Sequence, residues 1–115
     1  MTKAELLANK IDIDAGIENC GGMEDFYFEI VDDFENEEKR DELVTSFENE
    51  DWETYAIAVH AIKGILRMIG AGALGDLAEK LQFAAEAKDV DTIKQHHDEL
   101  TKKVELTIKM IKSAK

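Results

Sequence analysis

The chain has 115 residues, of which 44% are hydrophobic, an ordinary composition for one compact globular domain. No apolar run approaches the ~20 residues that a membrane-spanning helix requires. The 26 acidic residues outnumber the 14 basic ones and give a formal net charge of −12, which would repel a nucleic-acid backbone. These features exclude a membrane-spanning protein and argue against binding to nucleic acid. The opening residues carry no export signal, so we expect a cytoplasmic protein.

The absence of proline and the few sites of glycine favour long helices without interruption, and we predict an all-α fold. Residues 1–22 are expected to form short additional N-terminal helices. One lies near Thr2–Asn9. A second begins at Asp14 and ends before Gly21 and Gly22, where the chain can reverse its direction.

From Glu24 onward, apolar residues recur at steps of three and four, which is the period of one helix face. A break near Asn36 is expected, and Asn36 could cap a second segment that runs to about Asn49. Asp51 is a suitable N-cap for the next helix, which continues to Gly70 with an apolar side typical of a bundle helix.

Two further helices complete the predicted domain. One presents an apolar side between Leu74 and Ala85, and Asp89 or Asp91 caps a last helix that reaches Ile111. Short connections make neighbouring helices antiparallel. The sequence therefore predicts one domain over residues 1–115, with an up-and-down four-helix bundle at about residues 37–113.

His60 is the main candidate for chemistry. At about 100° per residue, it lies roughly 130° from the centre of the core-facing side of its helix and should reach solvent. Lys63 and Arg67 share its flank, and Gly64, one turn away, has no side chain. Transfer of a phosphoryl group to nitrogen needs a neutral imidazole, an open approach and nearby positive charge. His60, Gly64 and Lys63 would supply these in that order.

The stretch VHAIKGILRMIGAGAL, residues 59–74, resembles the histidine-containing phosphotransfer (HPt) domains of phosphorelays. That family shares a histidine followed by lysine at three, glycine at four and Gly-Ala at ten residues. Here these residues are His60, Lys63, Gly64 and Gly70-Ala71. The resemblance extends over nearly the whole chain.

The resemblance implies that His60 accepts a phosphoryl group at Nε2 from a receiver-domain aspartate and passes it to another receiver. It also implies that Lys63 supports the phosphate and that Gln82 hydrogen-bonds the histidine or its phosphate. From its place on the same flank, Arg67 is either an auxiliary cation of the site or a solvated surface residue. The expected partners are response-regulator receiver domains and a hybrid sensor kinase, and we expect a monomer. The chain has no Gly-rich nucleotide loop, so it should be a carrier without kinase activity or cofactor, with Mg²⁺ in the partner receiver.

Ile57, Ala61 and Met68 form an apolar stripe on the outer side of the same helix, on either side of Gly64. Two interpretations remain open. The short N-terminal helices could cover the stripe, or it could be a shallow surface onto which a receiver domain docks.

The other candidate residues are assigned to packing. His96 and His97 point about 100° apart on a helix, which is unfavourable for one metal ion; His97 is expected at the core edge and His96 on the surface. Trp52, Tyr55 and Phe83 have the spacing of packing residues.

Two other functions are compatible with a helical bundle. The first is a bundle that binds receiver domains without being phosphorylated. The second is a di-iron carboxylate bundle, which needs inward-facing Glu-x-x-His pairs, whereas Ile57 stands three residues before His60.

Overall fold

The computed structural model describes residues 2–114, and over that range the chain forms seven α-helices and no strand. The all-α class predicted from the sequence is confirmed. The helices are α1 (Lys3–Ala8), α2 (Ile13–Asn19), α3 (Glu24–Glu35), α4 (Glu38–Glu48), α5 (Trp52–Met68), α6 (Gly72–Glu86) and α7 (Val90–Ser113).

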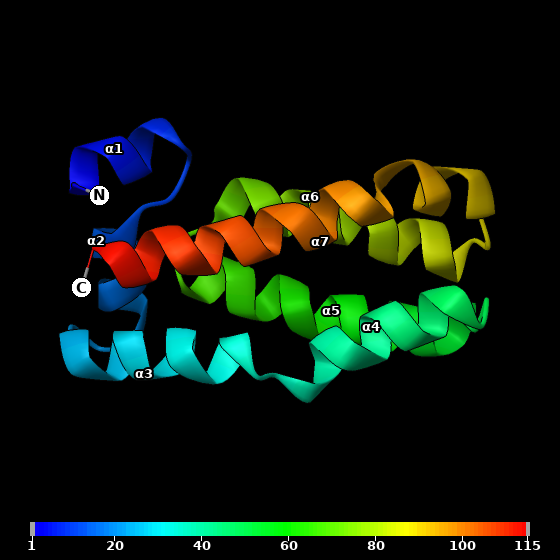
Figure 1. Ribbon diagram of the computed structural model, residues 1–115, viewed down its shortest axis with the longest axis horizontal. Coiled ribbons are helices and arrows are strands. Elements are labelled where there is room, and N and C mark those ends of the chain that lie inside the picture. Colours follow the sequence, from blue (N-terminus) through cyan, green and yellow to red (C-terminus); the bar gives the residue numbers. More distant parts are fainter. Residues whose placement is uncertain (1, 115) are drawn as a thin grey trace.

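The long helices form an elongated bundle (Figure 1). Helix α5 packs between α4 and α6, and α7 runs back along α6 and also contacts α3. Helices α3 and α4 follow one another along the same side of the bundle, so together they form its first rod (Figure 1). The bundle therefore begins at Glu24 and not near residue 37, because the apolar side of α3 also packs against α7.

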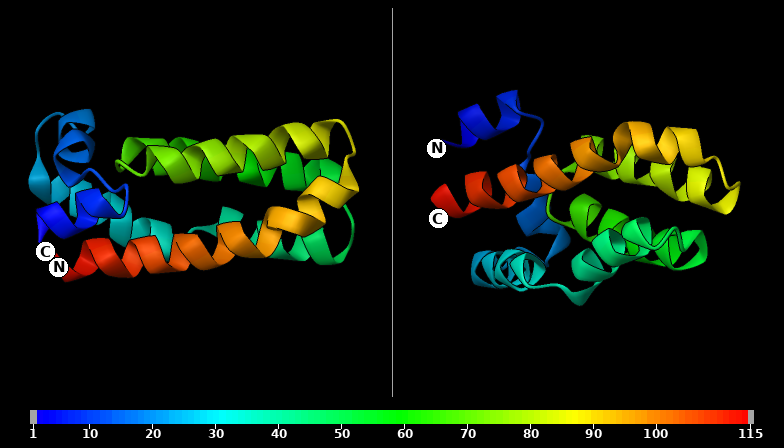
Figure 2. Two further views of the ribbon diagram at one scale, coloured as in Figure 1. Left: turned by 90° about the horizontal axis from the view of Figure 1, so that it is seen from above. Right: turned by 45° about the vertical axis from the view of Figure 1, so that its right-hand side comes forward.

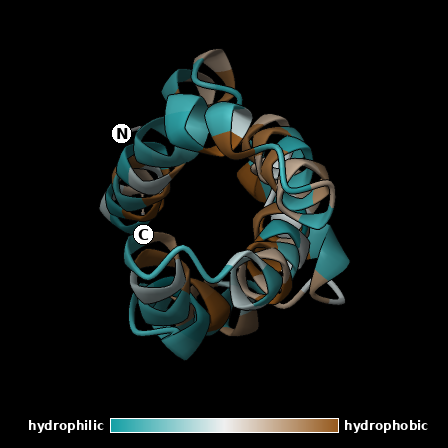
Figure 3. Cartoon of the chain, turned by 90° about the vertical axis from the view of Figure 1, so that its right-hand side faces the viewer, coloured by the Kyte–Doolittle hydropathy of each residue, from teal (hydrophilic) through white to brown (hydrophobic). Residues whose placement is uncertain are grey.

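The core lies along the bundle axis. Viewed down that axis, apolar ribbon segments gather on the inner sides of the helices and hydrophilic ones face outward (Figure 3). The largest fully buried side chains come from both the N-terminal region and the bundle. They are Leu6, Tyr27, Phe34, Tyr55, Ile62, Leu66, Ile69, Leu81, Ile93, Leu100, Ile108 and Ile111.

Two of the predicted N-caps, at the starts of α5 and α7, are confirmed. Thr2 opens α1 with a capping box, and the carboxylates of Asp51 and Asp89 accept the backbone N–H groups three residues on, both at 3.3 Å. Of the two candidates for the last helix, Asp89 is thus the N-cap. The 24-residue α7 runs the length of the bundle.

Two predicted helix starts were wrong. Asp12, not Asp14, caps α2, since its Oδ1 accepts the N–H of Ala15 at 3.0 Å. Asn36 ends α3, and Glu37 caps α4 through Oε1. Glutamate is an uncommon N-cap, whereas Asn is common at both ends of helices. A prediction from residue preferences therefore placed the start of α4 one position too early.

The N-terminal helices fasten the turn between α5 and α6. Gly70 has φ +90°, and a Cβ there would collide with the carbonyl oxygen of Asp12, whose own N–H donates to the Gly70 carbonyl at 2.9 Å. The buried Tyr27 hydroxyl donates to the carbonyl of Ile69 at 2.7 Å. The two views in Figure 2 place α1 and α2 at the end of the bundle where α7 finishes. These contacts fix the hairpin of α5 and α6 from one end.

Candidate functional site

His60 lies at the middle of α5 and its side chain is exposed, as its helical position predicts. The neighbouring residues Val59 and Ile62 are buried in the core. The backbone that carries His60 is therefore held by packing, while the imidazole faces outward beside the antiparallel helix α6.

Gln82 of α6 links His60 and Lys63. Its Oε1 lies 3.1 Å from Nδ1 of His60 and 2.8 Å from Nζ of Lys63, and Lys63 is only 13% exposed. Because an ammonium group can only donate, the amide atom that it contacts must be the oxygen. The same oxygen can only accept from His60, so in the neutral imidazole Nδ1 carries the proton and Nε2 has the free lone pair. Three of the predicted site residues thus meet at one atom.

A second set of polar contacts continues along α5 and α6. The guanidinium of Arg67 contacts Oδ1 of Asp76 at 3.1 Å and Oε2 of Glu79 at 3.2 Å, and these carboxylates raise the pKa of Arg67. The same Glu79 oxygen lies 3.8 Å from Nζ of Lys63. Arg67 is seven residues beyond His60, about 10 Å along the helix axis. Its connection to the site in the structure is indirect, through Glu79 and Lys63.

The stripe beside His60 is open along most of its length. Ile57 is 59% exposed and Met68 41% exposed, while Ala61 is half-buried. A Cβ placed on Gly64 would meet nothing within 4 Å outside its own helix. The side-chain amide of Asn19, on α2, donates to the backbone carbonyl of Met68 at 3.1 Å. The N-terminal region therefore contacts the backbone at the end of α5 and leaves the Met68 side chain exposed. The N-terminal helices therefore do not cover the side chains of Ile57 and Met68.

Two residues of the site region were missed or misread. Phe83 follows Gln82 and is 57% exposed, so the prediction that it is a packing residue was wrong. The sequence contained a signal for this exposure, because Phe83 does not lie on the apolar side of the helix to which Leu81 belongs. Glu79 received no role, although its place one turn before Gln82 puts it on the same side of α6.

Of the remaining histidines, His97 is buried, in agreement with its predicted place at the core edge, whereas His96 was predicted on the surface and is half-buried. His97 is buried, its Nδ1 is hydrogen-bonded to the hydroxyl of Tyr55 at 2.9 Å, and Phe47 stacks on its ring at 3.8 Å. Burial lowers the pKa of His97, which favours the neutral imidazole. The His96 side chain is 20% exposed and lies 3.3 Å from Glu99. Tyr55 is buried, consistent with its predicted packing role, and Trp52 is half-buried.

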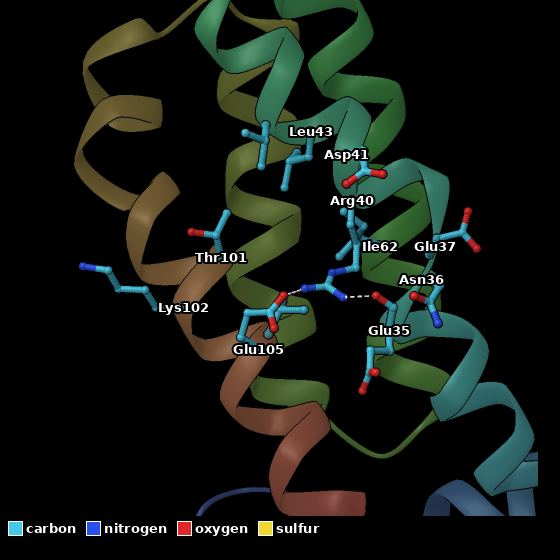
Figure 4. Close-up of a pocket in the computed structure, with 12 residues that line it drawn as sticks. Glu35, Asn36, Glu37, Arg40, Asp41, Leu43, Ile62, Thr101, Lys102 and Glu105 are labelled. Carbon is cyan, nitrogen blue, oxygen red and sulfur yellow. Dashed lines mark hydrogen bonds and ion pairs between the residues drawn. The ribbon is translucent and has the colours of Figure 1, made fainter.

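The pocket drawn in Figure 4, about 430 Å³, opens near the junction of α3 and α4. Arg40 crosses it, donating to the carbonyl of Glu35 at 2.7 Å and pairing with Glu105 of α7. Arg40 of α4 therefore connects the end of α3 to α7 at this junction. Ile62 lines this pocket from α5, and its direction is about 160° from that of His60 on the helix. The pocket and His60 accordingly lie on different sides of α5.

Over residues 2–114, no helix is long and apolar enough to cross a membrane, and no group of three or more His, Cys, Asp or Glu side chains is arranged to hold a metal ion.

The fold and site define a helical bundle that presents one imidazole, with a fixed tautomer and a neighbouring ammonium group, at the surface between two antiparallel helices. The Hpt domain family model matches residues 31–108, which include all the bundle residues of the site. The chain belongs to the Hpt domain family, whose members are phosphocarriers of histidine phosphotransfer in two-component signalling and interact with receiver domains of response regulators. No curated protein and no solved structure matched the chain. The match leaves out residues 1–30 and 109–115 and is thus narrower than the resemblance noted in the sequence.

Proposed function

We propose that this protein is the intermediate carrier of a phosphorelay, which accepts a phosphoryl group on His60 from one receiver-domain aspartate and returns it to another. The observation that carries the proposal is the shared oxygen of Gln82, which contacts both His60 and Lys63. This contact prepares one nitrogen of an exposed imidazole for attack and holds a cation beside it.

The transfer step uses the lone pair on Nε2. As Nε2 forms a bond to phosphorus, the bond between phosphorus and the aspartate oxygen of the receiver breaks, and the carboxylate leaves with that electron pair. The ring of His60 gains positive charge while Nδ1 keeps its proton. The hydrogen bond from Nδ1 to Gln82 then becomes charge-assisted and stronger. No proton has to move, so the same geometry serves the reverse step.

Lys63 is the cation closest to this reaction. Its ammonium group is three residues from His60 on the same helix flank and mostly shielded from solvent. Reduced solvation strengthens its attraction for the oxygens of a phosphoryl group on Nε2. In this proposal Mg²⁺ belongs to the receiver.

The exposed apolar side chains beside His60 would contact the receiver. Ile57 and Met68 lie along α5, Phe83 stands beside Gln82 on α6, and Gly64 leaves the space between them open. Such an apolar centre with a polar rim is typical of transient protein interfaces. We expect the protein to act as a monomer in the cytoplasm, between a hybrid sensor kinase and a response regulator.

The test is transfer of ³²P from purified phospho-receiver domains, followed by mapping of the labelled residue. Acid-labile label should appear on His60 and be lost in His60→Gln, whose helicity and melting temperature should match the wild type because the side chain is exposed. His96→Gln is the matched control and should keep full labelling. Label that persists in His60→Gln would refute the assignment.

The same experiment decides the alternative function, an adaptor that binds receivers without phosphorylation. A receiver that binds tightly and stays phosphorylated in the presence of the wild-type protein would favour the adaptor.

A further inference from the structure

Glu79 occupies a position between the two cations of the site. Its Oε2 lies 3.2 Å from the guanidinium of Arg67 and 3.8 Å from Nζ of Lys63. Arg67 is itself held by Asp76 at 3.1 Å, and its stem packs against α6, where a Cβ on Gly75 would lie 2.8 Å from Cγ of Arg67. Arg67 therefore anchors the carboxylate of Glu79 beside Lys63.

These contacts balance the charges before any phosphoryl group arrives. Lys63 and Arg67 face two carboxylates, so the site has cations but no net positive charge in this state. The oxygens of a phosphoryl group on His60 carry about −1.5 to −2 charges at pH 7, and the positive charge that the ring gains offsets part of this. The phosphoryl group attracts Lys63 in competition with Glu79 and is repelled by the Glu79 carboxylate.

We propose that Glu79 is a positioning residue that keeps the phosphoryl group transferable, because it competes with phosphohistidine for Lys63. This inference rests on the proposed function of His60. Without Glu79, Lys63 would turn fully to the phosphoryl oxygens, phosphorylated His60 would be more stable, and onward transfer would be less favourable. Glu79 acts through Lys63 and does not touch the reacting atoms.

The experiment measures the equilibrium distribution of ³²P between a receiver domain and His60 for the wild type and Glu79→Gln. The glutamine keeps the size of the side chain and removes its charge. We expect the equilibrium to shift toward phosphorylated His60 by about threefold to tenfold, as one charge at this range in a partly screened site would produce. An unchanged equilibrium would overturn the proposal.

Asp76→Asn is the control, because it removes the same charge from the same helix, leaves the contact between Arg67 and Glu79 in place, and affects no contact of Lys63. It should shift the equilibrium by less than twofold. An equal shift in Asp76→Asn would show a general effect of charge and would overturn the role of Glu79. Glu79→Gln should also lose most of its effect in a Lys63→Ala background, where only the direct repulsion from the carboxylate remains; a full shift there would mean that Glu79 does not act through Lys63.

A second measurement needs no receiver. His60 is phosphorylated chemically with phosphoramidate, and the pH midpoint of its ³¹P signal is recorded; the signal is identified by its absence in His60→Gln. Glu79→Gln should lower this midpoint by about half a pH unit, since removing the carboxylate favours the dianionic phosphoryl group. An unchanged midpoint refutes the proposal for Glu79. A failure of every receiver to phosphorylate the wild type, with the midpoint shifted as expected, refutes the relay function instead.

Discussion

Replacing Gln82 by Leu tests the link between the hydrogen bond to His60 and phosphoryl transfer. The substitution nearly preserves side-chain volume and removes the oxygen that accepts from both Nδ1 of His60 and Nζ of Lys63. Lys63 retains its 3.8 Å approach to Glu79, so it is not left as an unpaired charge. We therefore expect a small change in stability and a larger change in transfer.

The size of the effect follows from the charge on the ring. A hydrogen bond to a charged group contributes about 1.5–3 kcal/mol when it is shielded from water. His60 is exposed, so water replaces part of the lost interaction in the variant, and roughly 1 kcal/mol remains. That corresponds to about a fivefold slower transfer to His60.

Single-turnover transfer from a phospho-receiver measures this rate, and ¹⁵N NMR of the imidazole reports the tautomer. Wild-type His60 should carry its proton on Nδ1, and Gln82→Leu should show a mixture of tautomers. Gln82→Glu is the contrasting variant, because a carboxylate still accepts from Nδ1 but favours the protonated imidazolium, which has no free lone pair. It should hold the Nδ1 proton yet transfer slowly at neutral pH. Wild-type rates in Gln82→Leu, or a proton on Nε2 in the wild type, would refute the reasoning.

Three further predictions concern the surroundings of His60 and the core. Gly64→Gln should raise the free energy of unfolding by up to about 1 kcal/mol, because glycine is unfavourable inside a helix and the Cβ position is open. The same change should slow phosphoryl transfer, because the new side chain obstructs the receiver. Gly72→Gln, whose Cβ position is also open, is the control for transfer. Met68→Glu should weaken receiver binding by about tenfold, measured by calorimetry, because a charge would enter the apolar contact, whereas Leu106→Glu on α7 should leave affinity unchanged. Burial lowers the pKa of His97, so the unfolded chain binds more protons at this position and the free energy of unfolding should fall as pH drops below about 6.5. His97→Gln should flatten this part of the pH profile from urea denaturation, and an unchanged slope would assign it to other groups.

The sequence was sufficient for the elements whose signals are local. The helix that carries His60 has a strong N-cap in Asp51, an apolar side of regular period and a glycine at its end, and each of these signals is contained within a few residues. The exposure of His60 follows from the same period. The junction near Asn36 was misplaced because Asn is suited both to end a helix and to begin one.

The rest of the site depends on how two helices meet. Glu79 and Phe83 are separated from His60 by the turn at Gly70, and the lateral register of α5 and α6 decides which of their residues come together. That register is set by long-range contacts, such as the hydroxyl of Tyr27 on the carbonyl of Ile69 and the close packing at Gly75. No local pattern in α6 contains this information, so the ion pairs of Glu79 and the exposure of Phe83 required the structure.

The surroundings of His60 depart from what stability alone would favour, and they do so in several independent ways. Gly64 lies at an exposed position inside the continuous helix α5, where glycine costs about 0.5–1 kcal/mol relative to alanine, and no close contact requires it. Ile57 and Phe83 leave more than half of their apolar surface exposed, although other sites on these helices are buried. Because a single exposed apolar residue is ordinary in proteins, each feature alone would carry little weight. Their convergence on one imidazole with a fixed tautomer is better explained by a partner that approaches Nε2 over a surface kept open for it.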